Sequence, residues 1–244
     1  MIRGIFVTGT DTGVGKTRIA GGLVRRLRAA GIPAMPMKPV QTGAVRDARG
    51  RLVAPDVDEA LALAALALSP EERDALATYV FEPACSPHLA ARVAGVRIDL
   101  ARIAAAAARL AERHGALVVE GAGGVLVPLG RTATMLDLAV ALGLPAVVVA
   151  RAGLGTLNHT LLTVESLRRG GVPVRGVVLN DAAPPDPGAD LLRDDNAATL
   201  EARGFRVLAR VPWCPGDVAA LDAALAAIDP DRLLGDRAAP EARA

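Results

Sequence analysis

The sequence predicts an α/β fold: a single domain in which a parallel β-sheet carries helices on both faces. Three observations lead to this prediction. Short runs of Val, Ile, Leu and Ala alternate with segments whose apolar residues recur at helical spacing. The runs are continuously apolar, as expected for strands buried on both faces of a parallel sheet. Of the 244 residues, 52% are hydrophobic and 22% are charged, a composition that supports a folded core and argues against disorder.

The expected elements follow one another along the chain. Residues 2–8 are an apolar, β-branched run that ends in glycine, which indicates a strand. Residues 16–30 have helical spacing and are followed by Gly31, a common helix terminator. The same reasoning predicts strands at 33–37, 116–119, 145–149, 174–179 and 206–211. It predicts helices at 58–68, 99–113, 135–142, 156–169, 189–203 and 217–228.

Two connections between these elements are long, at residues 43–57 and 181–188. The second contains three prolines, which exclude a regular helix or strand. No repeat or linker divides the chain, so we expect residues 1–228 to form one domain. Residues 229–244, rich in Asp, Pro, Arg and Ala, are expected to be a frayed C-terminal tail.

Charge and composition exclude several classes of function. The 28 Lys and Arg residues nearly balance the 26 Asp and Glu residues, and no basic block is present, so we expect no nucleic-acid partner. The longest apolar stretch, 138–150, is interrupted by proline and is shorter than the roughly 20 residues that a membrane span needs. The distant Cys85 and Cys214 predict neither a disulfide nor a metal cluster. We expect a cytoplasmic protein with no membrane partner.

The first motif with chemical meaning is Gly-Thr-Asp-Thr-Gly-Val-Gly-Lys-Thr at residues 9–17. It follows a predicted strand and opens a predicted helix, the context that a phosphate-binding loop requires. Backbone N–H groups and the helix N-terminus attract phosphate. Lys16 can reach the outer phosphates, and the Thr17 hydroxyl can bind Mg²⁺. The fold is therefore expected to be P-loop NTPase-like, with the phosphates of a nucleotide and Mg²⁺ as ligands.

Two further signals stand at the ends of predicted strands. Lys38 opens the loop Lys-Pro-Val-Gln-Thr-Gly, and the only other lysine in the chain is Lys16. A cation in that position can stabilise charge on a transferring phosphate. Glu120 ends the strand 116–119 and precedes a run of glycines. A carboxylate at the end of a buried strand is typical of enzymes that hold Mg²⁺ beside a nucleotide.

Other polar residues are open to more than one interpretation. Asp58 is either a helix cap or a metal ligand. Asn180, followed by Asp181, is by its chemistry a turn residue, although its amide can read an adenine edge. The segment 211–213 likewise reads as a turn. Glycines precede the helix expected at 156–169, which favours an anion site suited to a carboxylate.

The order of these motifs resembles that of the dethiobiotin synthetase family. The sequences GTDTGVGKT, KPVQTG, SPHLAA, VEGAGG, GTLNHTLLT, LND and VPW occur in the family's order between residues 5 and 213. The resemblance implies an ATP- and Mg²⁺-dependent ligase that acts on 7,8-diaminononanoate and CO₂ or bicarbonate. An amine takes up CO₂ to give a carbamate, ATP converts it into a carbamic–phosphoric anhydride, and the second amine closes the cyclic urea.

The resemblance also implies roles for individual residues. Lys38 and Lys16 would be catalytic, and Thr17, Asp58 and Glu120 would hold Mg²⁺. The nucleotide and its metal would be bound by Gly13, Val14, Gly15, Lys16, Thr17, Asp58, Glu120, Gly121, Ala122, Gly123, Asn180, Asp181, Val211, Pro212 and Trp213. The diamine substrate would be bound by Thr12, Lys38, Thr42, Gly155, Thr156, Leu157 and Asn158, the last four from the neighbouring subunit of a homodimer.

Departures from the family pattern leave some points open. Gly13 stands where some relatives carry Glu. The 44–57 loop is long, so the metal ligand can be Asp56 instead of Asp58. A partitioning or metal-delivery ATPase is one alternative, but its signature lysine is replaced here by Asp11. A cobyrinate-type amide synthetase would need room for a glutaminase domain, and a non-catalytic nucleotide-binding regulator would not need Lys38.

Overall fold

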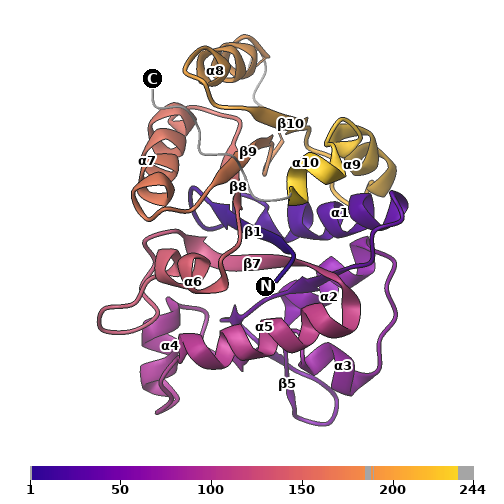
Figure 1. Ribbon diagram of the computed structural model, residues 1–244, viewed down its shortest axis with the longest axis vertical. Helices are drawn as coiled ribbons and strands as arrows, with labels where there is room; N and C mark the ends of the chain where they lie inside the picture. The colour runs from indigo at the N-terminus through magenta and orange to yellow at the C-terminus, as the bar shows by residue number, and fades with distance from the viewer. Residues whose placement is uncertain (1, 185–187, 189, 236–244) are drawn as a thin grey trace.

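Six parallel strands form the central sheet of the protein, which the computed structural model describes over residues 2–184, 188 and 190–235. Across the sheet the strands lie in the order β10, β9, β8, β1, β7, β2 (Figure 1). Their bounds are Gly4–Gly9 (β1), Ala34–Met37 (β2), Ala116–Gly124 (β7), Ala146–Arg151 (β8), Val174–Asn180 (β9) and Val207–Val211 (β10). Because β1 lies between β7 and β8, the loop that follows it emerges near the middle of the sheet.

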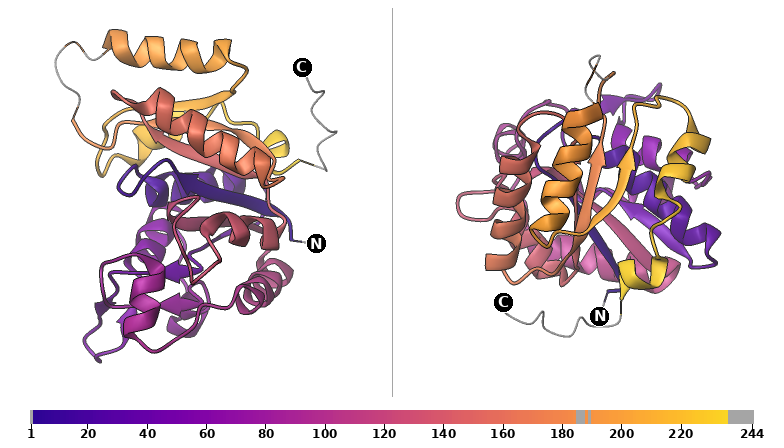
Figure 2. Two further views of the ribbon diagram at one scale, coloured as in Figure 1. Left: turned by 90° about the vertical axis from the view of Figure 1, so that its left-hand side faces the viewer. Right: turned by 90° about the horizontal axis from the view of Figure 1, so that it is seen from above.

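Helices cover both faces of this sheet (Figure 2). One face is covered by α1 (Lys16–Ala29), α9 (Val218–Leu225) and α10 (Pro230–Leu234). The other is covered by α5 (Leu100–His114), α6 (Met135–Leu142), α7 (Thr156–Arg169) and α8 (Asp190–Ala202). Side chains of β1 alternate between two cores: Ile5 and Val7 pack with α1, and Phe6 packs with the residues of α5 and α6. The strands are therefore apolar on both faces.

Shorter elements lie beyond the β2 edge of the sheet. They include the helices α2 (Pro55–Leu63), α3 (Pro70–Asp74) and α4 (Pro87–Val93). Strands β3 (Val40–Gln41) and β6 (Tyr79–Val80) pair in parallel, and β4 (Val45–Arg46) pairs with β5 (Leu52–Val53) in an antiparallel hairpin. These elements surround the loop that leaves β2, so they shape the space beside Lys38.

The predicted fold class is confirmed, and each predicted strand and helix has a counterpart in the structure. The differences arise where the pattern is short or irregular. The helix expected at 58–68 begins at Pro55, because proline suits the first turn of a helix, and ends at Leu63, shortly before Ala65 turns to a φ of 53°. The connection expected at 43–57 contains the β4–β5 hairpin, and the short elements α3, α4, β3 and β6 were not predicted.

The expected frayed tail is wrong for residues 229–235. The Asp229 side chain caps α10, and Leu233 and Leu234 are buried against the core. Residues 236–244, the remainder of that tail, lie outside the described residues, as do 185–187 of the proline-rich connection. Among the described helices, none combines the length and apolarity needed to cross a membrane.

Candidate active site

A cavity of about 690 Å³ lies at the carboxyl edge of the sheet. The loops after β1 and β2, the end of β7, and α2 all open into it, as expected for ligand sites in parallel sheets. Of the predicted site residues, Thr12, Gly13, Gly15, Lys16, Thr17, Lys38, Thr42, Glu120, Ala122 and Gly123 line this cavity. Residues far apart in the sequence are thus brought to one place.

The glycine loop is shaped by its neighbour Asn180. Gly15 precedes α1 with a φ of 92°, a left-handed conformation that favours glycine. A Cβ added to Gly15 would lie 2.2 Å from Nδ2 of Asn180. That amide nitrogen also donates to the carbonyl of Val14 at 2.9 Å. Because α1 has no acidic residue in its first turn, its free N–H groups and positive dipole face the cavity without a competing carboxylate.

Lys16 is largely buried beside this loop. Its Nζ donates to the carbonyl of Asp11 at 2.8 Å. Burial, followed by repulsion from the Lys38 ammonium, lowers the pKa of Lys16 from 10.5 to about 8. An anion in the cavity would favour the charged form of Lys16 and so raise its pKa again. The Lys16 side chain is therefore poised to gain stabilisation from a phosphate.

Lys38 lies between two carboxylates. Its Nζ is 2.6 Å from Oδ2 of Asp56 and 2.7 Å from Oε1 of Glu120, and the Lys38 and Glu120 side chains are 7% and 5% exposed. Burial alone would lower the pKa of Lys38, but the two carboxylates outweigh burial and raise it. The Lys38 ammonium thus stays charged inside the protein. The two predicted catalytic lysines are consequently opposite in character: Lys38 is neutralised by its neighbours, whereas Lys16 is not.

The oxygen atoms around Lys38 suit Mg²⁺. The Thr17 hydroxyl donates to Oε1 of Glu120 at 2.9 Å, which joins the end of the glycine loop to the end of β7. Mg²⁺ prefers hard oxygen ligands and usually keeps several positions for phosphate and water. A hydroxyl and two carboxylates, from Thr17, Glu120 and Asp56, therefore fit the ion. The described residues contain no group of three or more His, Cys, Asp or Glu side chains arranged for a metal, and this set has two carboxylates and a hydroxyl.

The structure places Asp58, one of the two aspartates expected as a Mg²⁺ ligand, away from the cavity. Asp58 forms an ion pair with Arg73 and does not line the cavity. Asp56, the alternative, contacts Lys38 there. The reason is helical geometry: residues two apart on α2 face different directions, whereas Asp56 and Glu59, three apart, share a face.

Sequence reasoning missed several residues of the cavity. Glu59 lines it with a raised pKa, caused by burial and by the charges of Asp56 and Glu120. The Gln41 Oε1 accepts from the backbone N–H of Asp56 at 3.3 Å, which positions the start of α2. The glutamine was visible in the quoted KPVQTG motif, but nothing in the sequence indicates its contact. Arg18 and the segment 84–87, which includes part of SPHLAA, complete the lining.

The segments expected to hold adenine lie together beside the glycine loop. Asn180 ends β9 and is in register with Val211 at the end of β10. Asp181 pairs with Arg193 at 2.7 Å, and Trp213 is 40% exposed. The Oδ1 atom of Asn180 is buried and has no hydrogen-bond partner among the described residues. Pro212 follows Val211, and none of these residues lines the cavity around Lys38.

The predicted carboxylate site stands apart from the cavity. Gly155 precedes α7 with a φ of 89°, and Thr156 is buried, with its hydroxyl 3.4 Å from that of Thr160. Leu157 is half-buried and Asn158 is exposed. Neither Gly155 nor these three residues lines the cavity within one chain. Val14 and Gly121 also do not line it; Val14 is fully buried in the core and the Gly121 carbonyl faces Lys38 Nζ at 3.4 Å.

Similarity to known proteins decides between the families that share this architecture. A family model described as "AAA domain" matches residues 3–219. An ATP-dependent dethiobiotin synthetase of Anaeromyxobacter dehalogenans strain 2CP-C is 48% identical over 93% of this chain and 97% of that protein. The corresponding protein of Paramagnetospirillum magneticum is 41% identical over 92% of this chain and 95% of its own length. The chain belongs to the dethiobiotin synthetase family.

Solved structures support the fold of this family member. A ParA family ATPase from Chlorobium tepidum TLS matches with a TM-score of 0.54 at 12% identity, over 93% of this chain and 92% of that one. The MinC:MinD complex of Aquifex aeolicus matches with a TM-score of 0.54 at 14% identity, over 91% and 86%. At such low identity these likenesses concern the fold alone. The family assignment thus confirms the resemblance seen in the sequence and agrees with an ATP-dependent ligase.

Proposed function

We propose that this chain converts 7,8-diaminononanoate, CO₂ or bicarbonate and ATP into dethiobiotin, ADP and phosphate, with Mg²⁺ as cofactor. The observation that carries this proposal is the position of Lys38. Its ammonium lies between Asp56 and Glu120, and Glu120 also accepts from Thr17 of the glycine loop. A buried cation is thereby held next to the place where the phosphate chain of a nucleotide would end. The names of the relatives supply the identity of the reaction.

The nucleotide would bind from the glycine loop to Asn180. Backbone N–H groups before α1 would hold the phosphates, with Lys16 against the outer ones. Mg²⁺ would be held by Thr17, Glu120 and Asp56, and it supplies neutralisation of phosphate charge. The unpartnered, buried Oδ1 of Asn180 can accept from the amino group of adenine. Asp181 and residues 211–213 would flank the base.

The reaction needs no nucleophile from the protein, because the diamine supplies both. The first amine adds to CO₂ and loses a proton, which gives a carbamate. A carbamate oxygen displaces ADP from the γ-phosphate and forms a carbamic–phosphoric anhydride. The second amine attacks the anhydride carbon, phosphate leaves, and the ring closes as the amine loses its proton. Lys38 and Lys16 would stabilise the anionic carbamate and the transferring phosphoryl group.

The substrate would lie over Thr12, Thr42 and the 121–123 glycine turn, with its carboxylate beyond the single-chain cavity. The N-terminus of α7 offers free N–H groups for a carboxylate. Because that terminus does not line the cavity of its own chain, its use requires a homodimer in which α7 of a second copy faces the substrate.

Mass spectrometry tests the proposal directly. Purified protein incubated with diaminononanoate, bicarbonate, ATP and Mg²⁺ should form dethiobiotin, and ¹³C-bicarbonate should add one mass unit to it. ADP and phosphate should appear in equal amounts and only when the diamine is present. Diamine-independent ATP hydrolysis at the same rate would instead favour a partitioning-type ATPase.

A further inference from the structure

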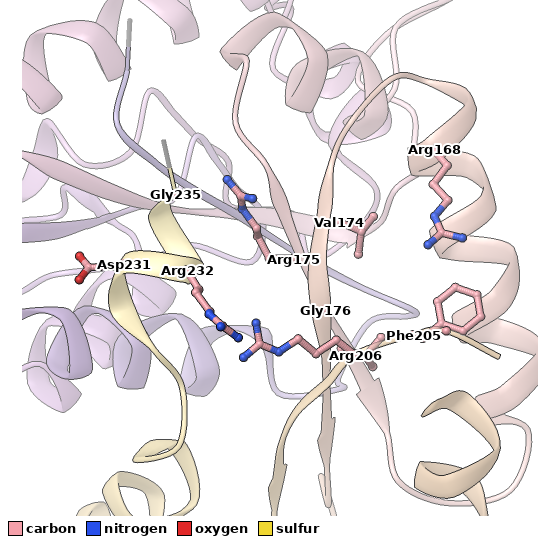
Figure 3. A pocket seen from close by; sticks show the side chains of 11 residues that line it. Arg168, Val174, Arg175, Gly176, Phe205, Arg206, Asp231, Arg232 and Gly235 are labelled. Carbon is pink, nitrogen blue, oxygen red and sulfur yellow. The ribbon is translucent and has the colours of Figure 1, made fainter. Parts of the chain in front are cut away.

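A second cavity lies at the amino ends of the strands, whereas the candidate active site lies at their carboxyl ends. It has a volume of about 570 Å³ and is formed by the amino ends of β9 and β10 together with α10 (Figure 3). The carboxyl end of β9, at Asn180, touches the glycine loop. Six residue steps along that strand separate Asn180 from Val174, or about 20 Å. The two cavities share no lining residue, so this is a separate place on the molecule.

Arginine dominates the lining of this cavity. Arg168, Arg175, Arg206 and Arg232 line it, and the one acidic residue among its lining residues is Asp231. Figure 3 shows the side chains of Arg206 and Arg232 pointing toward one another, while the Asp231 carboxylate points away from them. Guanidinium groups stay protonated in proteins, so their mutual repulsion cannot be relieved by loss of a proton.

Two of these arginines have no partner in the part of the chain that the structure describes. Within the described residues, the side chains of Arg175 and Arg206 form no ion pair or hydrogen bond, and Nε of Arg175 is buried and unsatisfied. Arg232 meets Asp229 only at 3.6 Å, with both side chains largely exposed. Arg168 lies over the ring of Phe205, 5.1 Å from its centre. A buried donor left without an acceptor is costly, so an acceptor supplied by a ligand would relieve it.

We infer that this cavity binds a small oligoanion with phosphate groups. Arginine forks match phosphate oxygens with two parallel hydrogen bonds, and balancing Arg175 and Arg206, which have no partner among the described residues, requires more than one negative charge. A free oligophosphate and the phosphate chain of a nucleotide share this chemistry. The inference does not depend on the proposed reaction, because none of the residues in it belongs to the candidate active site.

Calorimetric titration of the full chain with inorganic tripolyphosphate and with ADP tests the inference. All proteins carry Lys16→Met, which weakens binding at the glycine loop. Arg175→Gln/Arg206→Gln should reduce affinity at least roughly tenfold. Arg97→Gln/Arg109→Gln removes the same charge from exposed positions elsewhere and should leave affinity unchanged. Tighter binding of tripolyphosphate would identify a free oligophosphate as the ligand, and tighter binding of ADP a nucleotide.

Two results would overturn the inference. The first is equal affinity in the double variant and its parent, and the second is an equal loss in the charge-matched control. If Arg175→Gln/Arg206→Gln fails to fold, the exposed Arg206→Gln replaces it, with the same expected direction of change.

Discussion

Asp56 places Oδ2 at 2.6 Å from Nζ of Lys38, so of the two aspartates of α2 it is Asp56 that faces the cavity. Asp56→Asn should therefore raise the Mg²⁺ concentration needed for half-maximal turnover by about tenfold or more, because an anionic oxygen ligand is lost while the shape is kept. Turnover measured against Mg²⁺ concentration checks this.

Asp58→Asn is the matched control for that substitution. Asp58 lies on the same helix but pairs with Arg73 in a half-exposed position. Its loss should leave the Mg²⁺ dependence unchanged and alter the free energy of unfolding by at most about 1 kcal/mol. A shifted Mg²⁺ dependence in Asp58→Asn together with a normal one in Asp56→Asn would contradict the assignment.

Lys38→Met should lower turnover about 10²–10³-fold, the usual effect of losing a charge-stabilising group in a water-poor site. Lys38→Arg keeps the charge and should retain more of the activity. Because removal of Lys38 leaves Asp56 and Glu120 without their cation, the melting temperature must be measured in parallel. A folded Lys38→Met protein with near-normal turnover would refute the catalytic role of this lysine.

The pKa of Lys16, about 8, predicts a pH dependence of nucleotide binding. Phosphate stabilises the protonated amine and raises its pKa in the complex. Below pH 8 Lys16 is already charged and affinity is flat; above it, binding takes up a proton and affinity falls as pH rises. Calorimetry at about pH 8.5 in two buffers with different ionisation enthalpies measures that uptake. Lys16→Met should abolish it, and identical uptake in both proteins would assign the proton to another group.

Asn180→Ala should weaken ATP binding about tenfold, since the side chain both braces Val14 and offers the unpartnered Oδ1. Asn196 provides a control, because it is equally buried but donates to the carbonyl of Ala152 instead. If Asn180 contacts the base, binding of inorganic triphosphate should fall less than binding of ATP. Equal losses for both ligands would restrict Asn180 to shaping the loop.

A diamine of the same length that lacks the carboxylate should bind far more weakly than diaminononanoate, without a change in ATP affinity. Free N–H groups at the start of α7 are the expected carboxylate site. Sedimentation measurements combined with assays at decreasing protein concentration test its placement on a second copy. Turnover that stays full in a demonstrated monomer would refute that placement.

The sequence was most informative where the pattern was long or the motif local. Continuous apolar runs located all six strands of the main sheet, and the GKT motif located the glycine loop. The elements between β2 and β7 were harder, because strands of two residues have no measurable period. Asp56 and Asp58 could not be told apart in sequence, since the choice depends on where α2 begins. Proline at residue 55 marks that start, so Asp56 and Glu59 both lie within the helix and share a face because they are three residues apart.

Both lysines of the chain line the candidate active site, so an isotope or chemical label placed on lysine side chains reports on that site alone. Lysine labelled with ¹⁵N in its side chain and supplied during expression would give two side-chain NMR signals, one from each lysine in the cavity. The unlabelled arginine side chains would give no signal. Nucleotide and diamine could then be titrated while the two ammonium groups are followed separately. Amine-reactive labels detected by mass spectrometry would likewise show how far each ligand protects the two lysine side chains, with the N-terminal amine as the internal reference.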